Sequence, residues 1–166
     1  PEIDGPLLFE QIETSRDSLA AYLPWVATTL TANDEINFLN TTLKLFGART
    51  ALHLTIYQAD APVGMISLNT IDTLVRHKAD IGYWLTIPER GKGIMHKSIE
   101  ALADIAFHDY DLNKLTINAA VANRASNAVA EKAGFHLDGT LRQDDQRADG
   151  TFLDVNTYSL LRSEWA

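Results

Sequence analysis

The chain has 166 residues, with 22 acidic against 14 basic side chains and a formal net charge of -8. This length suits a single domain over residues 1–166, and the negative charge argues against nucleic-acid binding through a general basic surface. The absence of cysteine excludes disulfides, thiolate metal sites and a cysteine nucleophile. No apolar run approaches the roughly 20 residues that cross a bilayer, and no signal peptide is recognisable. The sequence therefore predicts a cytoplasmic protein without a membrane partner.

The first fifty residues carry helical patterns. Apolar spacing predicts one or two short helices within residues 7–22, ending before Pro24. Thr31, with Asp34 three residues later, predicts the N-cap of a helix that runs to about Phe46. The expected core-facing residues of this helix are Ile36, Leu39, Leu43 and Phe46.

The middle of the chain changes to the period of strands. Residues 52–57 and 63–68 flank a turn and alternate in a way typical of a β-hairpin. Residues 80–87 predict a third strand, with Tyr83 and Leu85 on one face. After a glycine-rich junction, apolar residues from Met95 to Ala106 recur at the spacing of an amphipathic helix.

The last third alternates strands with one short helix. Residues 115–121 predict a strand, and residues 123–134 a helix that Asn123 caps and Gly134 ends. Two further strands are expected at Phe135–Leu141 and Phe152–Leu161, joined by a polar loop. The single strand–helix–strand unit predicts a parallel pair inside a mixed, mostly antiparallel sheet, an α/β (α+β) fold.

The junction PERGKGIMHKS, residues 88–98, resembles two nucleotide-binding patterns incompletely. A P-loop, G-x-x-x-x-G-K-[ST], places Lys97 and Ser98 correctly, but His96 stands where the second glycine is needed. A dinucleotide fingerprint, G-x-G-x-x-G, fits Gly91 and Gly93 and meets the same histidine. Both patterns need a backbone that folds closely around phosphate, which a histidine side chain obstructs.

A third pattern, [QR]-x-x-G-x-[GA], holds the pyrophosphate of coenzyme A between a strand and a helix. Arg90 and Gly93 fit it, whereas Met95 replaces the small last residue. Backbone N–H groups that converge at a helix N-terminus suit a pyrophosphate, and Arg90 and Lys92 add positive charge. A solvated glycine turn is the alternative for the same residues.

Three segments together resemble the GNAT superfamily of N-acetyltransferases. They are IGYWLTIPERGKGIM, NRASNAVAEKAGF and DVNTYSLLRSEW, and SLAAYLPWV adds a fourth. Their order and spacing are most similar to the branch that holds the ribosomal-protein N-terminal acetyltransferases of the RimJ/RimL type. The branch normally begins with a strand before the first helix, which this sequence is expected to lack.

The resemblance implies acetyl-CoA as co-substrate and a central pair of parallel strands that part to admit its pantetheine arm. The N–H groups of Thr86 and Ile87 would meet the pantetheine, and Asn123 would face it or serve only as a helix cap. The pyrophosphate would be held by the backbone of Gly91, Gly93, Ile94 and Met95. No metal site is expected, since the five histidines show no metal-binding spacing.

The resemblance also implies direct attack of an amine on the thioester, which requires a base, an acid and donors to the developing oxyanion. Ser126 is the candidate acid and Asp145 the candidate base, with Asp144 beside it at the acceptor. Trp25 would wall the acceptor site, although a packing role fits it equally. Three other carboxylates, expected on helix surfaces, are alternatives at the amine site: Glu10, Glu13 and Glu35.

The acceptor stays open at this point. A protein N-terminus, a small amine such as a polyamine or aminoglycoside, and a non-catalytic acyl-CoA-binding module all fit the residues. The resemblance implies a homodimer as one possible assembly.

Overall fold

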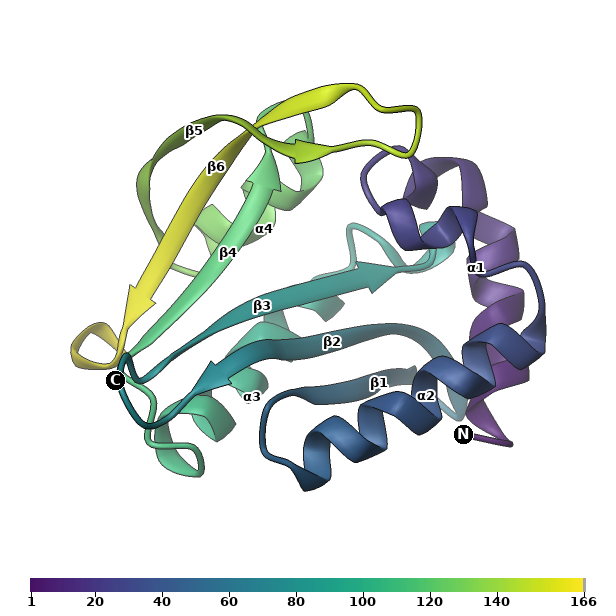
Figure 1. Ribbon diagram of the computed structural model, residues 1–166, viewed down its shortest axis with the longest axis horizontal. Helices are drawn as coiled ribbons and strands as arrows, with labels where there is room; N and C mark the ends of the chain where they lie inside the picture. Colours follow the sequence, from purple (N-terminus) through teal and green to yellow (C-terminus); the bar gives the residue numbers. More distant parts are fainter. Residues whose placement is uncertain (166) are drawn as a thin grey trace.

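The computed structural model describes residues 1–165 and centres on a six-stranded sheet with helices on both faces (Figure 1). The elements, in chain order, are α1 (Asp4–Ala20), η1 (Pro24–Ala27), α2 (Ala32–Gly47), β1 (Leu52–Gln58), β2 (Ala61–Asp72), β3 (Lys78–Leu85), η2 (Ile87–Glu89), α3 (Ile94–His108), β4 (Lys114–Ala120), α4 (Arg124–Lys132), β5 (His136–Gln146), β6 (Phe152–Leu161) and η3 (Arg162–Glu164).

The sheet has the strand order β1-β2-β3-β4-β6-β5. Every neighbouring pair is antiparallel except β3 and β4, which run parallel, so the predicted mixed sheet is confirmed. The recorded pairing of β3 with β4 ends at Asp80 and Thr116, yet β3 continues to Leu85 and β4 to Ala120. Beyond that point the two strands diverge (Figure 1). We call the region where the backbones of β3 and β4 are no longer paired the central opening of the sheet.

Successive side chains of one strand enter two different cores. Ile66 and Leu85 belong to the larger apolar cluster, which includes α3 residues, whereas Met65 and Trp84 pack with α1 and α2. Adjacent strand residues point to opposite faces, so the sheet separates the two groups of helices. Figure 1 shows α2 in front of the sheet and α3 behind it. This arrangement leaves both edges of the central opening lined by well-packed strands.

Helix α2 confirms its predicted start but not its predicted core face. The Thr31 side chain accepts a hydrogen bond from the Asp34 N–H, and Asp34 bonds back to the Thr31 N–H, a complete capping box. Leu39 is buried, but Leu43 and Phe46 are 55% and 52% exposed. The prediction for these two was wrong because α2 packs largely on α1 and buries only a narrow stripe, namely Glu35, Leu39 and Thr42.

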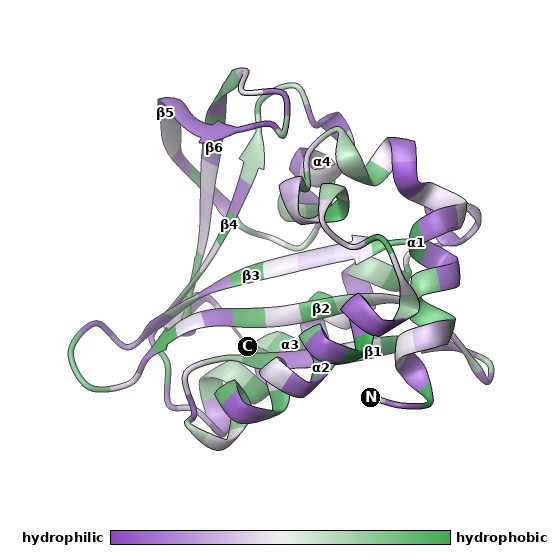
Figure 2. Cartoon of the chain, turned by 45° about the vertical axis from the view of Figure 1, so that its right-hand side comes forward, coloured by the Kyte–Doolittle hydropathy of each residue, from purple (hydrophilic) through white to green (hydrophobic). Residues whose placement is uncertain are grey.

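The last hairpin extends further than predicted. β5 continues to Gln146, past its expected end at Leu141, although its pairing with β6 is irregular between Leu141 and Asp145. Gln143 takes a left-handed φ of 52° there, as at a bulge. The hydrophilic β5 (purple in Figure 2) thus forms an arm that ends beside α1, where the Arg147 guanidinium lies 5.6 Å from the Tyr22 ring centroid.

Among residues 1–165, no helix is both long and apolar enough to cross a membrane. Within the same residues, no three histidine or carboxylate side chains gather where a metal ion would be held.

Candidate active site

The register of β3 determines which of its backbone groups face the central opening. The Thr86 N–H donates to the Val63 carbonyl at 2.8 Å, on the β2 side. Backbone groups of an antiparallel strand alternate between its two neighbours. Tyr83 and Leu85 therefore direct their N–H and C=O groups toward β4, where the partner strand has moved away. The Leu85 carbonyl accepts a hydrogen bond from the Arg90 side chain. The other groups are suited to pair with the amides of an extended ligand.

Strand β4, on the other side of the opening, shows the same alternation of its backbone groups. The Val121 N–H donates to the Asp154 carbonyl at 2.9 Å, on the β6 side, so Asn118 and Ala120 direct their backbone toward β3. The Ala120 carbonyl already accepts a hydrogen bond from the Asn123 N–H at 2.8 Å. Asn118 thus supplies the backbone groups of β4 that face the opening past the last β3–β4 pair.

The two residues predicted to meet the pantetheine are engaged inside the chain. The Thr86 N–H is used by β2, and the Ile87 N–H donates to the Ser15 hydroxyl at 2.9 Å. The Ser15 and Thr86 hydroxyls are 3.0 Å apart, and both are buried. Both N–H groups predicted to meet the pantetheine therefore have partners inside the chain in this structure. By alternation, the backbone groups that face the opening belong to Tyr83 and Leu85.

The glycine junction forms the turn that starts α3. Gly91 and Gly93 have φ of 76° and 79°, values that L-residues with a side chain rarely adopt, and no atom lies within 4 Å of where a Cβ would sit. The first helical hydrogen bond runs from the Lys97 N–H to the Gly93 carbonyl. The N–H groups of Ile94 and Met95 precede it, so they are available to an anion at the helix N-terminus. The Met95 side chain is buried, which explains why a bulky residue fits.

The basic residues of the junction have partners. Arg90 donates from Nε to the Leu85 carbonyl at 3.0 Å and from Nη1 to the Ser18 hydroxyl at 2.6 Å. Partial burial lowers the pKa of Arg90 from its ordinary value. Lys92 pairs with Glu89 at 3.1 Å and is exposed. Arg90 therefore supports the end of β3, while Lys92 is the cation nearer solvent.

The start of α4 brings together three of the side chains of interest. The Asn123 side chain caps the helix by accepting a hydrogen bond from the Ser126 N–H at 3.2 Å. The Ser126 hydroxyl lies 2.8 Å from the hydroxyl of Tyr83, which comes from β3 across the opening. Burial raises the pKa of Tyr83 to about 12.

The predicted acidic pair lies in strand β5 rather than in a loop. Asp144 and Asp145 are exposed, and Asp145 accepts a hydrogen bond from the Gln146 N–H at 2.7 Å. They occupy the arm that approaches α1, so the structure does not group them with Ser126 or Asn123 in any recorded hydrogen bond among residues 1–165.

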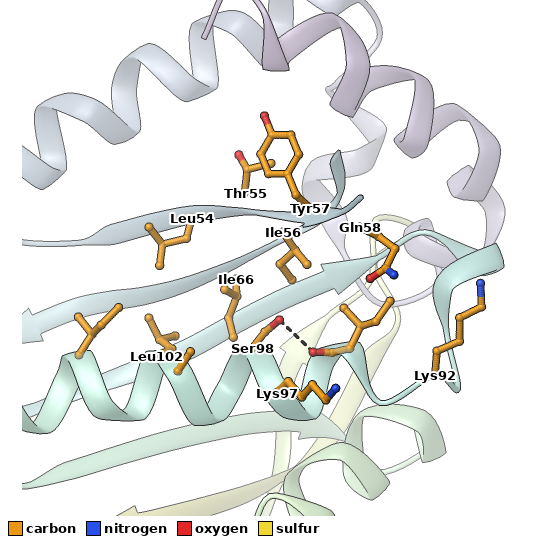
Figure 3. Close-up of a pocket in the computed structure, with 13 residues that line it drawn as sticks. Leu54, Thr55, Ile56, Tyr57, Gln58, Ile66, Lys92, Lys97, Ser98 and Leu102 are labelled. Carbon is orange, nitrogen blue, oxygen red and sulfur yellow. Dashed lines mark hydrogen bonds between the residues drawn. The ribbon is translucent and has the colours of Figure 1, made fainter. Parts of the chain in front are cut away.

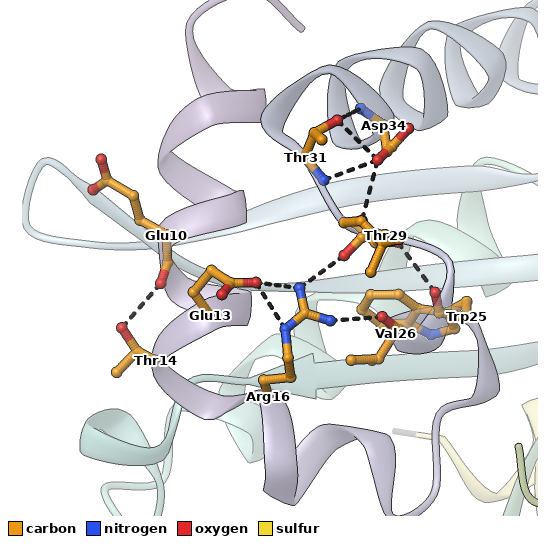
Figure 4. A network of polar contacts seen from close by, with 10 residues as sticks. Glu10, Glu13, Thr14, Arg16, Trp25, Val26, Thr29, Thr31 and Asp34 are labelled. Atoms are coloured by element: carbon orange, nitrogen blue, oxygen red, sulfur yellow. Dashed lines mark hydrogen bonds and ion pairs between the residues drawn. The ribbon is translucent and has the colours of Figure 1, made fainter. Parts of the chain in front are cut away.

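Trp25 lies on a segment that Arg16 holds in place (Figure 4). Arg16 donates to the Val26 and Thr29 carbonyls, each at 2.7 Å, and pairs with Glu13. The Trp25 ring is 36% exposed and its centroid lies 6.2 Å from that of buried Trp84. One side of Trp25 thus packs on the β3 face opposite Tyr83, and the other side is open to solvent.

A cavity of about 490 Å³ lies elsewhere, between edge strand β1 and α3 (Figure 3). Its floor is apolar, with Leu54, Ile66 and Leu102, and Lys92 and Lys97 also line it. Only Lys92 and Ile94 are shared with the predicted site, and the parted strands do not line it. We therefore place the candidate site at the central opening.

Sequence reasoning missed Tyr83, Ser15 and the burial of Glu35. The sequence pattern identifies Tyr83 only as a residue on one face of a strand. Ser15 falls on the apolar stripe of α1, between Ile12 and Leu19, and a hydroxyl in such a stripe signals a buried partner. Glu35 occupies the equivalent position one turn before Leu39, so the same signal was present there.

Comparison with known proteins places the chain in a family. Residues 2–136 match the family model described as Acetyltransferase (GNAT) domain, so the chain belongs to this family. A solved structure described as the ribosomal-protein α-N-acetyltransferase RimL, in complex with coenzyme A, superposes with a TM-score of 0.92 at 27% identity. It covers 99% of this chain and 92% of the other. The fold expected from the resemblance is thereby confirmed.

Two curated relatives are similar over part of their length. The putative ribosomal N-acetyltransferase YdaF of Bacillus subtilis (strain 168) is 43% identical over 102 residues, which cover 61% of this chain and 55% of the relative. The ribosomal-protein-serine acetyltransferase of Escherichia coli (strain K12) is 36% identical over 104 residues, 63% of this chain and 57% of the relative. The matches thus span little more than half of these relatives.

Proposed function

We propose that the protein transfers an acetyl group from acetyl-CoA to a primary amine, and that the amine is the N-terminal α-amine of a protein. The observation that carries the proposal is the parting of β3 from β4 next to a glycine-rich helix N-terminus. The opening offers unpaired strand backbone to the amides of a pantetheine, and the helix offers N–H donors to a pyrophosphate.

The residues of the opening fit coenzyme A in three places. Backbone groups of Tyr83 and Leu85 face the gap on one side, and Asn118 faces it on the other. The N–H groups of Ile94 and Met95 precede the first helical hydrogen bond of α3. Bound there, acetyl-CoA supplies an activated acetyl thioester. Asn123, the cap of α4, follows the end of β4 by three residues.

The chemistry needs a group that removes a proton from the amine and a donor near the departing sulfur. We assign the second role to Ser126, whose half-buried hydroxyl stands in the first turn of α4. We assign the first role to Asp145, with Asp144 beside it, because the β5 arm ends next to the segment that leads to Trp25. Since both aspartates are exposed, a water molecule between Asp145 and the amine would fit their setting.

The protein acceptor is inferred from the relatives. The two curated relatives described above are named for ribosomal acetylation, and one of them is named for serine. The half-exposed ring of Trp25 offers a flat apolar surface against which the first residues of a peptide can pack.

The first experiment measures thiol release from acetyl-CoA with a panel of acceptors. The panel contains peptides that begin with serine or alanine, the same peptides blocked at the N-terminus, free lysine, spermidine and an aminoglycoside. Each acceptor is tested with the wild type, Asp145→Asn, and Asp60→Asn, which changes an exposed aspartate in the β1–β2 turn.

We expect turnover with free but not blocked peptides, reduced by Asp145→Asn at least tenfold and unchanged by Asp60→Asn. Turnover only with spermidine or the aminoglycoside would retain the chemistry and reject the protein acceptor. Acetyl-CoA binding without turnover on any acceptor would leave a binding module as the better account.

A further inference from the structure

Two tyrosine side chains reach from the sheet to helix α4. Tyr83 extends from β3, and its hydroxyl lies 2.8 Å from the Ser126 hydroxyl and 3.2 Å from the Ser126 carbonyl oxygen. Tyr158 extends from β6 and donates to the Asn127 side-chain oxygen at 2.8 Å. Consecutive residues of α4 therefore contact strands on either side of β4. Only the Tyr83 contact crosses the opening between the parted strands.

Tyr83 stands at the place where the sheet has just opened. It follows Asp80, the last β3 residue that pairs with β4, by three positions. Its ring packs against the larger apolar cluster, on the α3 face of the sheet. A ring fixed in this way delivers its hydroxyl with little freedom, because a tyrosine side chain has only two rotatable angles before the oxygen. Ser126, in contrast, carries a hydroxyl that rotates freely unless a partner fixes it.

We propose that Tyr83 is a positioning residue for acetyl transfer, whose hydroxyl orients the Ser126 hydroxyl toward the opening between β3 and β4. This proposal rests on the proposed function, because it assumes that the sulfur of the coenzyme lies beside Ser126. Neither the acetyltransferase family match nor the sequence pattern of the site assigns a role to this tyrosine.

The proton positions explain how the contact works. Tyr83 has one O–H, and both the Ser126 carbonyl and the Ser126 hydroxyl oxygen are within its reach. If Tyr83 donates to the carbonyl, its oxygen accepts the Ser126 proton, and Ser126 has nothing left to donate. If Tyr83 donates to the Ser126 hydroxyl oxygen, the Ser126 O–H becomes free to point at the departing sulfur. One rotation of the phenol O–H thus changes Ser126 from a satisfied residue to a donor, with no covalent bond made or broken.

The environment of Tyr83 keeps its hydroxyl protonated, so that it can donate a hydrogen bond. Burial raises the pKa of Tyr83 to about 12, so the phenol keeps its proton throughout the pH range in which an acetyltransferase is assayed. The hydrogen-bonded Ser126 is also held at its backbone, since its N–H donates to the Asn123 cap. The motion that remains is rotation of the Ser126 hydroxyl, and the hydrogen bond with Tyr83 restricts this rotation.

The test uses Tyr83→Phe, Ser126→Ala, the double variant, and Tyr158→Phe as a matched control. The control removes the buried Tyr158 hydroxyl, which donates to Asn127, the residue that follows Ser126 in α4. Without it, the Asn127 side-chain oxygen still accepts a hydrogen bond from Asn156 at 2.7 Å. For each variant, kcat and KM for acetyl-CoA are measured in the thiol-release assay, with the acceptor that the wild type uses. Thermal unfolding of each variant is recorded alongside.

We expect Tyr83→Phe to lower kcat about three- to tenfold, the effect of one net hydrogen bond, with KM for acetyl-CoA changed less than about twofold. In the double variant kcat should equal that of Ser126→Ala alone, because Tyr83 acts through Ser126. Tyr158→Phe should lower the melting temperature without lowering kcat more than about twofold.

Three results would overturn the inference. As long as the wild type turns over, they leave the proposed function intact. These are multiplicative losses in the double variant, full activity of Ser126→Ala, and equal losses from Tyr83→Phe and Tyr158→Phe. If Tyr83→Phe does not fold, Ser126→Ala provides the test, because Ser126 is half-exposed and its replacement should leave the fold intact. Full activity of Ser126→Ala would then reject the inference. A wild type that releases no thiol with any acceptor removes the proposed function and this inference with it.

Discussion

Glu35 should make the protein less stable as the pH rises through neutrality. This carboxyl lies on the buried stripe of α2 and is 2% exposed. Burial raises the pKa of Glu35 from 4.5 to about 7, and no charged neighbour contributes to the shift. The folded protein therefore binds the Glu35 proton more tightly than the unfolded chain does. Linkage then requires stability to fall between about pH 4.5 and pH 7, and to be constant with respect to this group on either side.

The size of this effect follows from the shift. A pKa shift of that size corresponds to about 3 kcal/mol, and relaxation of the folded protein around the ionised carboxyl reduces the effect on stability to roughly 1–2 kcal/mol. Glu35→Gln removes the ionisation while nearly keeping the shape of the protonated acid. We expect the variant and the wild type to have similar stability at pH 5, and the variant to gain about 1–2 kcal/mol relative to the wild type by pH 8.

Urea unfolding at four pH values between 5 and 8 measures the difference. Glu10→Gln is the control, because Glu10 is exposed on α1 and its replacement should shift stability by less than about 0.5 kcal/mol at each pH. Parallel pH profiles for the wild type and Glu35→Gln would refute the reasoning, since they would mean that Glu35 ionises in the folded protein as easily as in the unfolded chain.

Three further perturbations follow from single contacts. Thr31→Ala removes the capping box of α2 and should cost about 1 kcal/mol in urea unfolding, whereas an unchanged midpoint would deny the cap any net contribution. Gly93→Ala forces a left-handed φ on alanine and should weaken coenzyme A binding at least tenfold by calorimetry, an outcome that undiminished affinity would contradict. Arg16→Met should raise KM for the acceptor about tenfold with KM for acetyl-CoA unchanged. Arg162→Met, which breaks a similar contact with the Phe107 carbonyl, should affect neither, and equal effects of both variants would reject a local role for Arg16.

The elements that could be predicted from the sequence are those with a local cause. The capping pair of Thr31 and Asp34, the apolar period that starts at Met95, and the glycine stop at Gly134 each act over a few residues, and the structure has all three. Local sequence did not determine which side of α2 faces the core, because that side depends on where α1 lies. Leu43 and Phe46 therefore continue the apolar spacing but remain exposed.

The candidate site divides in the same way. The glycine turn was visible in the sequence, because a left-handed φ selects glycine at the position itself. The contact of Tyr83 with Ser126 joins residues 43 positions apart, and it exists only because β3 and α4 flank the same opening. Sequence spacing alone does not show such a contact. Likewise, the pairing of β3 with β2 engages the Thr86 N–H, and the packing of α1 on the end of β3 brings Ser15 to the Ile87 N–H.

Helix α1 connects the two sides of the proposed reaction. Ser15 bonds the Ile87 N–H, and Ser18 accepts from Arg90, so this helix holds the base of the glycine junction. Arg16, between them, holds the segment that carries Trp25 through two backbone carbonyls. Residues one to three positions apart on this helix thus hold both the turn proposed to bind the coenzyme and the segment proposed to line the acceptor side. Because attack on a thioester depends on the relative placement of its two reactants, we infer that α1 sets this distance through its contacts with the two segments.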